Sequence, residues 1–164
     1  MEEWITIPGF PNYAVSNMGR VQNTATGKIL AIRVTQQGHR FVGMNAGKIQ
    51  CQRSVAKLVA DAFVDKLRED FDYPIHLDGD LSDNRASNLM WRPHWFGVRY
   101  MKQMKRGQVF KEANPIVDLH TGETYQTPWM ASMVNGLIES EILLAIANRT
   151  YVFPTFQEFR FVAK

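Results

Sequence analysis

The chain has 164 residues, 45% of them apolar, and a formal net charge of +3 at pH 7, which allows one compact domain or two or three small modules in series. No apolar run reaches the length of about 18 residues that a membrane span needs, and the first residues lack the basic and apolar regions of a signal peptide, so we expect a cytoplasmic protein without a membrane partner. The single cysteine, Cys51, excludes an internal disulfide and a zinc site built from cysteines.

The N-terminal third alternates short apolar runs with turn residues. Strands of a few residues separated by Gly and Asn turns are typical of a twisted antiparallel sheet, which we expect over residues 1–53 as a β-rich module. From Ser54 onward the apolar residues follow a helical spacing that includes Val55, Leu58 and Val59. A hydroxyl at Ser54 suits the N-terminal cap of this first helix.

The middle of the chain predicts two short strands and a second helix. The strands cover residues 74–77 and 88–91, with a polar loop between them. The helix runs from about Pro93 to Arg106 and ends at Gly107. We expect residues 54–106 to form one domain and residues 107–114 to be a linker.

The C-terminal segment, residues 115–164, predicts a hairpin around Thr121-Gly122, two helices and a closing strand. The helices cover residues 128–134 and 140–148 and are interrupted at Asn135-Gly136. Two short helices joined at a glycine turn are typical of a helix-turn-helix module. The predicted fold class is therefore α+β: an N-terminal antiparallel sheet, a strand-strand-helix unit and a small C-terminal helical module.

The most informative stretch runs from His76 to Trp91 and reads H-x-D-G-D, then D-N, then N-L-x-W. These residue types and spacings resemble the HNH motif (ββα-metal motif) of homing and phage endonucleases. Residues 4–21 resemble the nuclease-associated module that precedes such motifs, and residues 115–162 resemble the helix-turn-helix repeat at the C-terminus of intron-encoded nucleases. Over nearly its whole length the chain is thus similar to the phage and intron-encoded HNH homing endonucleases.

The resemblance implies a hairpin packed on a helix around one divalent metal, Mg²⁺ or Mn²⁺, that cuts a DNA phosphodiester bond. By position, His76 matches the general base that deprotonates water. Asn88 matches the residue that closes the hairpin and orients the base. Asp78, Gly79 and Asn84 match residues that shape the loop.

The metal positions depart from the family's pattern. The resemblance places one ligand directly before the base and another twenty-one residues after it, where this chain has Ile75 and Gly97. Neither side chain can ligate a hard cation. His94, Asp78 and Asp80 are the candidate replacements. The centre is therefore either a surviving nuclease site or a relic in a nuclease-dead DNA-binding or protein-binding phage regulator, with His76 kept only as a packed hairpin residue.

Basic residues are concentrated in two stretches, with a net charge of +5 over residues 1–60 and +5 over residues 91–113, on either side of −5 over residues 61–90. Each Lys or Arg on a phosphate releases a counterion, so these stretches favour double-stranded DNA as the partner. The alternative is ordinary solvated faces. The predicted DNA contacts are Arg20, Arg33, Arg40, Arg99, Lys102, Lys105, Arg106 and Lys111.

The C-terminal module is a weaker candidate for reading DNA. Glu139 and Glu141 lie at the N-terminal end of its second helix, which is the end of a recognition helix that meets the bases. Carboxylates at this end would repel the DNA phosphates. Trp129, Met130 and Met133 offer a protein-binding face, as an alternative to a place in the core. We expect a monomer that binds double-stranded DNA, with a protein partner at this module as the alternative.

Overall fold

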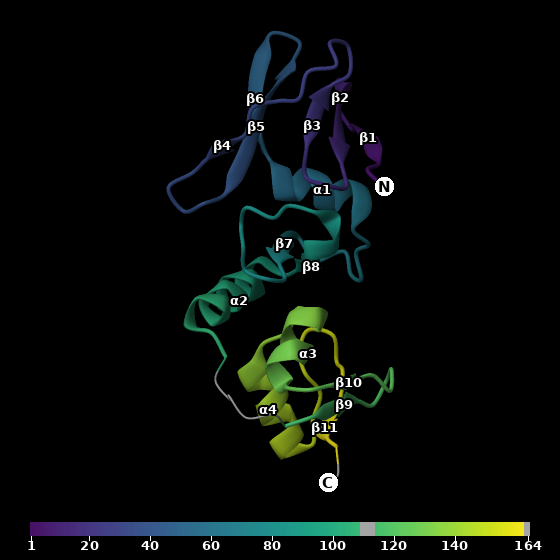
Figure 1. Cartoon of the computed structure of the whole chain (residues 1–164), viewed down its shortest axis with the longest axis vertical. Helices are drawn as coiled ribbons and strands as arrows, with labels where there is room; N and C mark the ends of the chain where they lie inside the picture. The colour runs from purple at the N-terminus through teal and green to yellow at the C-terminus, as the bar shows by residue number, and fades with distance from the viewer. Residues whose placement is uncertain (109–113, 163–164) are drawn as a thin grey trace. The chain divides into compact units, whose positions relative to one another are not determined.

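The computed structural model describes residues 1–108 and 114–162, which group into two compact units, Met1–His94 and Trp95–Lys164 (Figure 1). The predicted linker, residues 107–114, falls mostly on residues 109–113, which lie outside the described residues. Each unit has its own apolar core. The two units are therefore described separately.

The first unit begins with two small antiparallel sheets. The strands of the first sheet are β1 (Trp4–Ile7), β2 (Phe10–Ser16) and β3 (Val21–Asn23), in that order. The strands of the second sheet are β4 (Arg33–Val34), β5 (Arg40–Ala46) and β6 (Ile49–Ser54), also in order. Consecutive strands pair because short turns, several with a glycine at positive φ, connect them. The short antiparallel strands agree with the prediction, but they form two sheets and not one.

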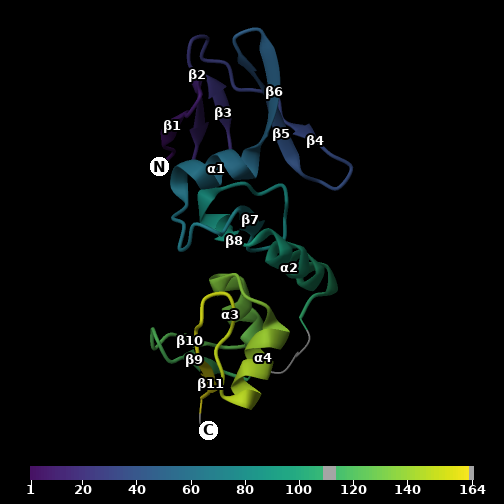
Figure 2. The same ribbon diagram turned by 180° about the vertical axis from the view of Figure 1, so that it is seen from behind.

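Helix α1 (Val55–Phe63) supplies the centre of the first core. Its cap is the predicted one, since the Ser54 hydroxyl accepts a hydrogen bond from the amide of Lys57 at 3.4 Å. The apolar face of the helix is buried against the sheets and against Trp91. Figures 1 and 2 show α1 between the two N-terminal sheets and the hairpin of β7 and β8.

The hairpin consists of β7 (Tyr73–His76) and β8 (Leu89–Arg92), joined by a loop that ends in a 3-10 turn, Ala86–Asn88. The strands are antiparallel, with Ile75 opposite Met90 and His76 opposite Leu89. Burial of Trp91 fixes the hairpin on α1, because its indole N–H donates to the carbonyl of Val64 at 3.0 Å.

Helix α2 (His94–Arg106) begins at the last residue of the first unit, and its remaining residues belong to the second. The other elements of the second unit are β9 (Ile116–Asp118), β10 (Thr124–Tyr125), α3 (Pro128–Asn135), α4 (Glu139–Asn148) and β11 (Phe159–Phe161). The strands form one antiparallel sheet in the order β10-β9-β11. Its core contains Ile116, Leu137, Ile142 and Phe159.

The turn between α3 and α4 changes the chain direction by 116°. Gly136 makes this turn, with φ 57, as the left-handed cap of α3. The angle falls in the range of helix-turn-helix pairs. Among the described residues no single helix is long and apolar enough to cross a membrane, and only this bent pair reaches the required length and hydropathy when taken together.

The predicted fold class is confirmed: small antiparallel sheets, a strand-strand-helix segment and a C-terminal helical module are all present. The two compact units divide at residues 94 and 95. The finer division into residues 1–53, 54–106, 107–114 and 115–164 stays a prediction.

Candidate active site

His76 is the last residue of β7 and is only 4% exposed. Its Nε2 lies 3.1 Å from the side-chain oxygen of Asn84, which is also buried. The amide nitrogen of Asn84 donates to the carbonyls of Leu81 and Ser82, at 3.3 and 3.4 Å. These two bonds orient the Asn84 oxygen toward the imidazole, so Nε2 carries the proton and Nδ1 is left as the proton acceptor.

Burial lowers the pKa of His76 below its ordinary value, while the hydrogen bond to Asn84 and the charge of Asp78 act in the opposite direction. The imidazole is consequently neutral at neutral pH. A neutral imidazole with one free ring nitrogen can accept a proton from water, which is the chemistry of a general base.

Asn88 fastens the two ends of the hairpin loop together. Its side-chain oxygen accepts from the amide of Asp78 at 3.1 Å, and its nitrogen donates to the Asp78 carboxylate at 2.8 Å and to the carbonyl of Asp83 at 2.9 Å. Its own carbonyl accepts from the amide of Leu77 at 2.9 Å. The side chain of Asn88 therefore holds the loop, and the side chain that bonds to the imidazole is that of Asn84.

The other loop residues are held by local bonds. The Asp78 carboxylate accepts from the amide of Asp80 at 2.8 Å, and the Asp80 carboxylate accepts from the amide and hydroxyl of Ser82 at 2.8 and 3.0 Å. Gly79 adopts φ 77, a conformation that favours glycine. Hydrogen bonds from Ser82 lower the pKa of Asp80. The loop thus uses both carboxylates as structural acceptors.

A turn of the N-terminal sheet packs against this loop. The carbonyl of Asn17 accepts from the amide of Ala86 at 2.8 Å. Gly19 has φ +82, and a Cβ added there would lie 3.1 Å from the Cβ and from the carbonyl oxygen of Asn84. The N-terminal module is therefore in direct contact with the residue that orients His76.

His76 lines a pocket of about 420 Å³ together with His39 and His94. Asp72 and Tyr73 also line it, and the Asp72 carboxylate accepts from the amide of His94 at 3.0 Å. Sequence reasoning missed His39, because it lies in the turn before β5 and no spacing relates it to the hairpin. Three imidazoles from separate parts of the first unit thus line one pocket.

The residues at the metal positions do not fit a resident divalent cation. Ile75 is apolar and 1% exposed, and Gly97, in the first turns of α2, has no side chain. Within residues 1–108 and 114–162, no group of three or more His, Cys, Asp or Glu side chains is arranged to hold a metal ion. Of the candidate replacements, Asp78 and Asp80 are bonded within the loop and His94 lies in the wall of the pocket.

The predicted DNA contacts fall into two groups by their surroundings. Arg20 pairs with Glu2 and lies over the ring of Trp4, and Arg99 pairs with Glu141. Five other members are exposed or half-exposed and form no ion pair with the residues that the structure describes: Arg33, Arg40, Lys102, Lys105 and Arg106. Lys111 lies outside the described residues.

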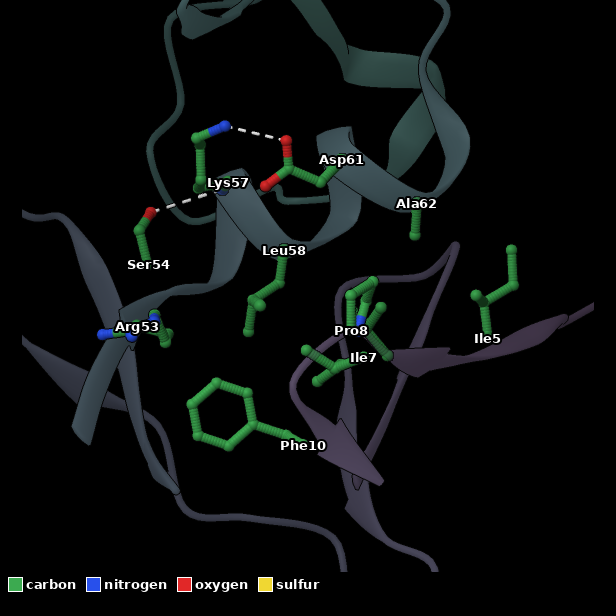
Figure 3. A pocket seen from close by; sticks show the side chains of 11 residues that line it. Ile5, Ile7, Pro8, Phe10, Arg53, Ser54, Lys57, Leu58, Asp61 and Ala62 are labelled. Atoms are coloured by element: carbon green, nitrogen blue, oxygen red, sulfur yellow. Dashed lines mark hydrogen bonds and ion pairs between the residues drawn. The ribbon is translucent and has the colours of Figure 1, made fainter. Parts of the chain in front are cut away.

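A second pocket of the first unit, about 570 Å³, lies between α1 and strands β1 and β2 (Figure 3). Ile5, Ile7, Phe10 and Leu58 give it an apolar lining. None of its lining residues comes from the hairpin. The larger pocket shares Ser54 and Lys57 with the pocket of His76, but His76 itself does not line it.

Residues 2–45 match the NUMOD4 motif. An uncharacterized HNH endonuclease of Acanthamoeba polyphaga mimivirus is 40% identical over 94 residues, which are 55% of this chain and 23% of the relative. The DNA endonuclease I-HmuI of Bacillus phage SP01 is 32% identical over 106 residues, which are 64% of this chain and 59% of the relative. The chain thus spans about a quarter of the viral relative and somewhat more than half of the phage one.

One solved structure is similar over nearly the full length of both chains. It is described as "DNA binding and cleavage by the HNH homing endonuclease I-HmuI". The similarity has a TM-score of 0.57 and 25% sequence identity and covers 99% of each chain. The likeness therefore includes both units and the hairpin that carries His76.

Proposed function

Because this chain belongs to the HNH homing-endonuclease family, we propose that it binds double-stranded DNA and cuts a phosphodiester bond in it, with His76 as the general base. The observation that carries the proposal is the buried, neutral imidazole at the end of β7, held through Nε2 by Asn84 and lining a pocket. The relatives and the similar solved structure are named as endonucleases, which favours cleavage over a nuclease-dead descendant.

In this proposal, Nδ1 of His76 takes a proton from a water molecule as the water oxygen attacks phosphorus. The P–O bond to a sugar oxygen of the DNA breaks, and that oxygen takes a proton from solvent. Asn84 keeps the imidazole in the tautomer that leaves Nδ1 free, and Asn88 keeps the loop closed around it. His39 and His94 line the same pocket as His76. The chain's own residues thus supply the base and its orientation.

HNH endonucleases use a divalent metal, and Mg²⁺ or Mn²⁺ is the cation proposed here. Since Ile75 and Gly97 offer it no ligand, this chain's residues do not form a preformed site for it. The missing ligands are the reason to test a second candidate function, binding of DNA without cleavage, although the names of the relatives do not favour it. The two candidates differ in a single measurable property, which is nicking.

Contact with the DNA backbone is proposed for the exposed cations, above all Lys102, Lys105 and Arg106 on α2. Arg33 and Arg40 on the second sheet are the candidates in the first unit. A monomer in an infected bacterial cell is the expected form of the protein, and a protein partner at the C-terminal module is the alternative to a DNA contact there.

The test compares the purified protein with His76→Ala on supercoiled plasmid, with Mg²⁺, with Mn²⁺ and with a chelator, while DNA retention is measured in parallel. We expect nicking that requires a cation and falls about 100-fold or more in the variant, the usual contribution of a general base. Retention without nicking in any cation would establish the binding-only alternative. Absence of both would overturn the proposed function.

A further inference from the structure

The second unit carries an exposed aromatic cluster, defined here as Trp95, Tyr151, Phe153 and Phe156. These side chains are 51%, 62%, 39% and 52% exposed. The rings of Trp95 and Phe153 are stacked, with centroids 5.5 Å apart and an interplanar angle of 23°. Phe156 meets Phe153 edge-on at 5.8 Å. Four large aromatic side chains are thus gathered at one surface and remain accessible.

The cluster adjoins hydrogen-bonding groups and a row of cations. An open pocket of about 310 Å³ is lined by Trp95, Tyr151 and Phe153 together with Asn148 and Thr150. Arg99 lines this pocket as well as a second one, of about 320 Å³, whose other lining residues include Lys102 and Arg106. The two pockets therefore meet at a shared guanidinium.

The row of cations runs along one side of α2. Trp95, Arg99, Lys102 and Arg106 are four, three and four residues apart, so they project from neighbouring positions of the helix. Lys102 and Arg106 are exposed and form no ion pair within the described residues, and Arg99 pairs with Glu141. Positive charge without an internal partner favours an anionic ligand beside the aromatic cluster.

Accessible aromatic faces next to a row of cations match the chemistry of an unpaired nucleic-acid strand. Its bases present flat faces that stack on aromatic side chains, and its phosphates follow the cations. In a duplex, neighbouring base pairs cover these faces, so stacking on a protein ring requires a base outside the helix.

We propose that the second unit binds an unpaired segment of DNA, with one base stacked in the pocket of Trp95, Tyr151 and Phe153. The adjoining phosphates lie along Arg99, Lys102 and Arg106. The inference rests on the proposed function, since it takes DNA as the ligand, and it adds that part of the bound DNA is unstacked. Asn148 and Thr150 provide hydrogen-bonding groups for the edge of the base.

The experiment measures binding of the full chain to a fluorescein-labelled single-stranded oligonucleotide and to its duplex, by anisotropy. Trp95→Leu keeps an apolar side chain but removes the aromatic face, and Trp95→Tyr restores one. We expect about tenfold weaker single-strand binding for Trp95→Leu, in line with one lost stacking contact, and near wild-type binding for Trp95→Tyr. Phe161→Ala, which truncates an exposed aromatic residue of the same unit outside both pockets, is the matched control.

The outcomes separate the inference from the proposed function. Single-strand binding that is unchanged in Trp95→Leu, or reduced equally in Phe161→Ala, overturns the inference. Wild-type protein that binds the duplex but not the single strand overturns the inference alone and leaves the cluster as a surface for a protein partner. Failure to bind the duplex overturns the proposed function. Circular dichroism of each variant shows that the fold is kept.

Discussion

Asn84 is the residue that sets the state of His76. Its hydrogen bond raises the pKa of the imidazole against the larger lowering effect of burial. The base works in its neutral form, so nicking falls as the pH drops through the lowered pKa, below about 6.5. For Asn84→Ala we expect about tenfold slower nicking, because one hydrogen bond that orients the imidazole is lost. We also expect the acid limb of the pH profile of nicking to move to lower pH, because that hydrogen bond raises the pKa of His76.

The carboxylate variant gives the opposite shift. Asn84→Asp places a negative charge beside the imidazole, which favours its protonated form and raises its pKa. The acid limb of the pH profile should then move to higher pH, with single-turnover nicking on plasmid as the measurement. Acid limbs that coincide in the two variants would show that another group controls the profile.

The same buried imidazole predicts a pH-dependent stability. Because its pKa is lowered in the folded protein, the unfolded chain binds more protons between that pKa and about 6.5. The contribution of the neutral His76 side chain to the free energy of unfolding is fully present above about pH 6.5 and is lost as the pH falls through its lowered pKa. Urea unfolding between pH 5 and 8 gives the free energy of unfolding at each pH, and we expect this free energy to rise with pH. His76→Gln should reduce the slope of that rise by at most about 1.4 kcal/mol per pH unit. Equal slopes in the two proteins would contradict this.

At the scale of elements, the turn between β2 and β3 supports the hairpin loop. Gly19→Ala introduces strain at a positive φ and also a Cβ within 3.1 Å of Asn84. Gly47→Ala is the matched control, since its φ is +60 and nothing lies within 4 Å. We expect both variants to lose about 1–3 kcal/mol in the free energy of unfolding through backbone strain, and only Gly19→Ala to lose nicking beyond that. Equal nicking by the two variants would show that the turn between β2 and β3 does not support the candidate active site.

The cations on helix α2 allow a direct test of the proposed contacts with the DNA backbone. Each phosphate contact that is removed reduces the slope of log affinity against log salt by about one unit, whatever the DNA sequence. We expect this for Lys102→Ala and Arg106→Ala, measured by duplex binding between low and physiological salt. Arg68→Ala, in the acidic stretch and paired with Asp70, is the control and should leave the slope unchanged.

Helix α4 shows why its acidic start was hard to interpret from sequence. Glu139 is fully buried, and its amide donates to the side chain of Gln103 at 2.6 Å. Glu141 pairs with Arg99. The Glu141 carboxylate is therefore paired, and the Glu139 side chain is buried inside the second unit. The pairing partners lie on α2, more than thirty residues earlier, so no local pattern reveals them.

At the scale of the whole molecule, two separate cores predict two separable unfolding events. Val59 belongs to the first core and Ile142 to the second, and both are 0% exposed. We expect Val59→Ala to lower the stability of the first unit and Ile142→Ala that of the second, each by about 1–4 kcal/mol. Hydrogen exchange resolved by peptide measures both units at once. A uniform loss of protection across the chain would show a single cooperative unit.

Local signals made much of this architecture predictable. The helical spacing after Ser54, the proline at residue 93 and the glycine at residue 136 marked helix ends that the structure confirms within one or two residues. The motif from His76 to Asn88 located the candidate site because its spacing is contained in one hairpin. His39 and the partnership of Gly19 with Asn84 were not predictable, since tertiary packing alone brings these residues to the loop.

The contact between the Asn17–Gly19 turn and the hairpin loop limits how this protein can be recombined. A chimera that joins the first sheet of one homologue to the hairpin of another would mismatch two surfaces that pack so closely that a methyl group at Gly19 would lie 3.1 Å from Asn84. Exchange at the level of the entire first unit keeps that fit intact. Swapping experiments should therefore cut after residue 94 and not between the sheets and the loop.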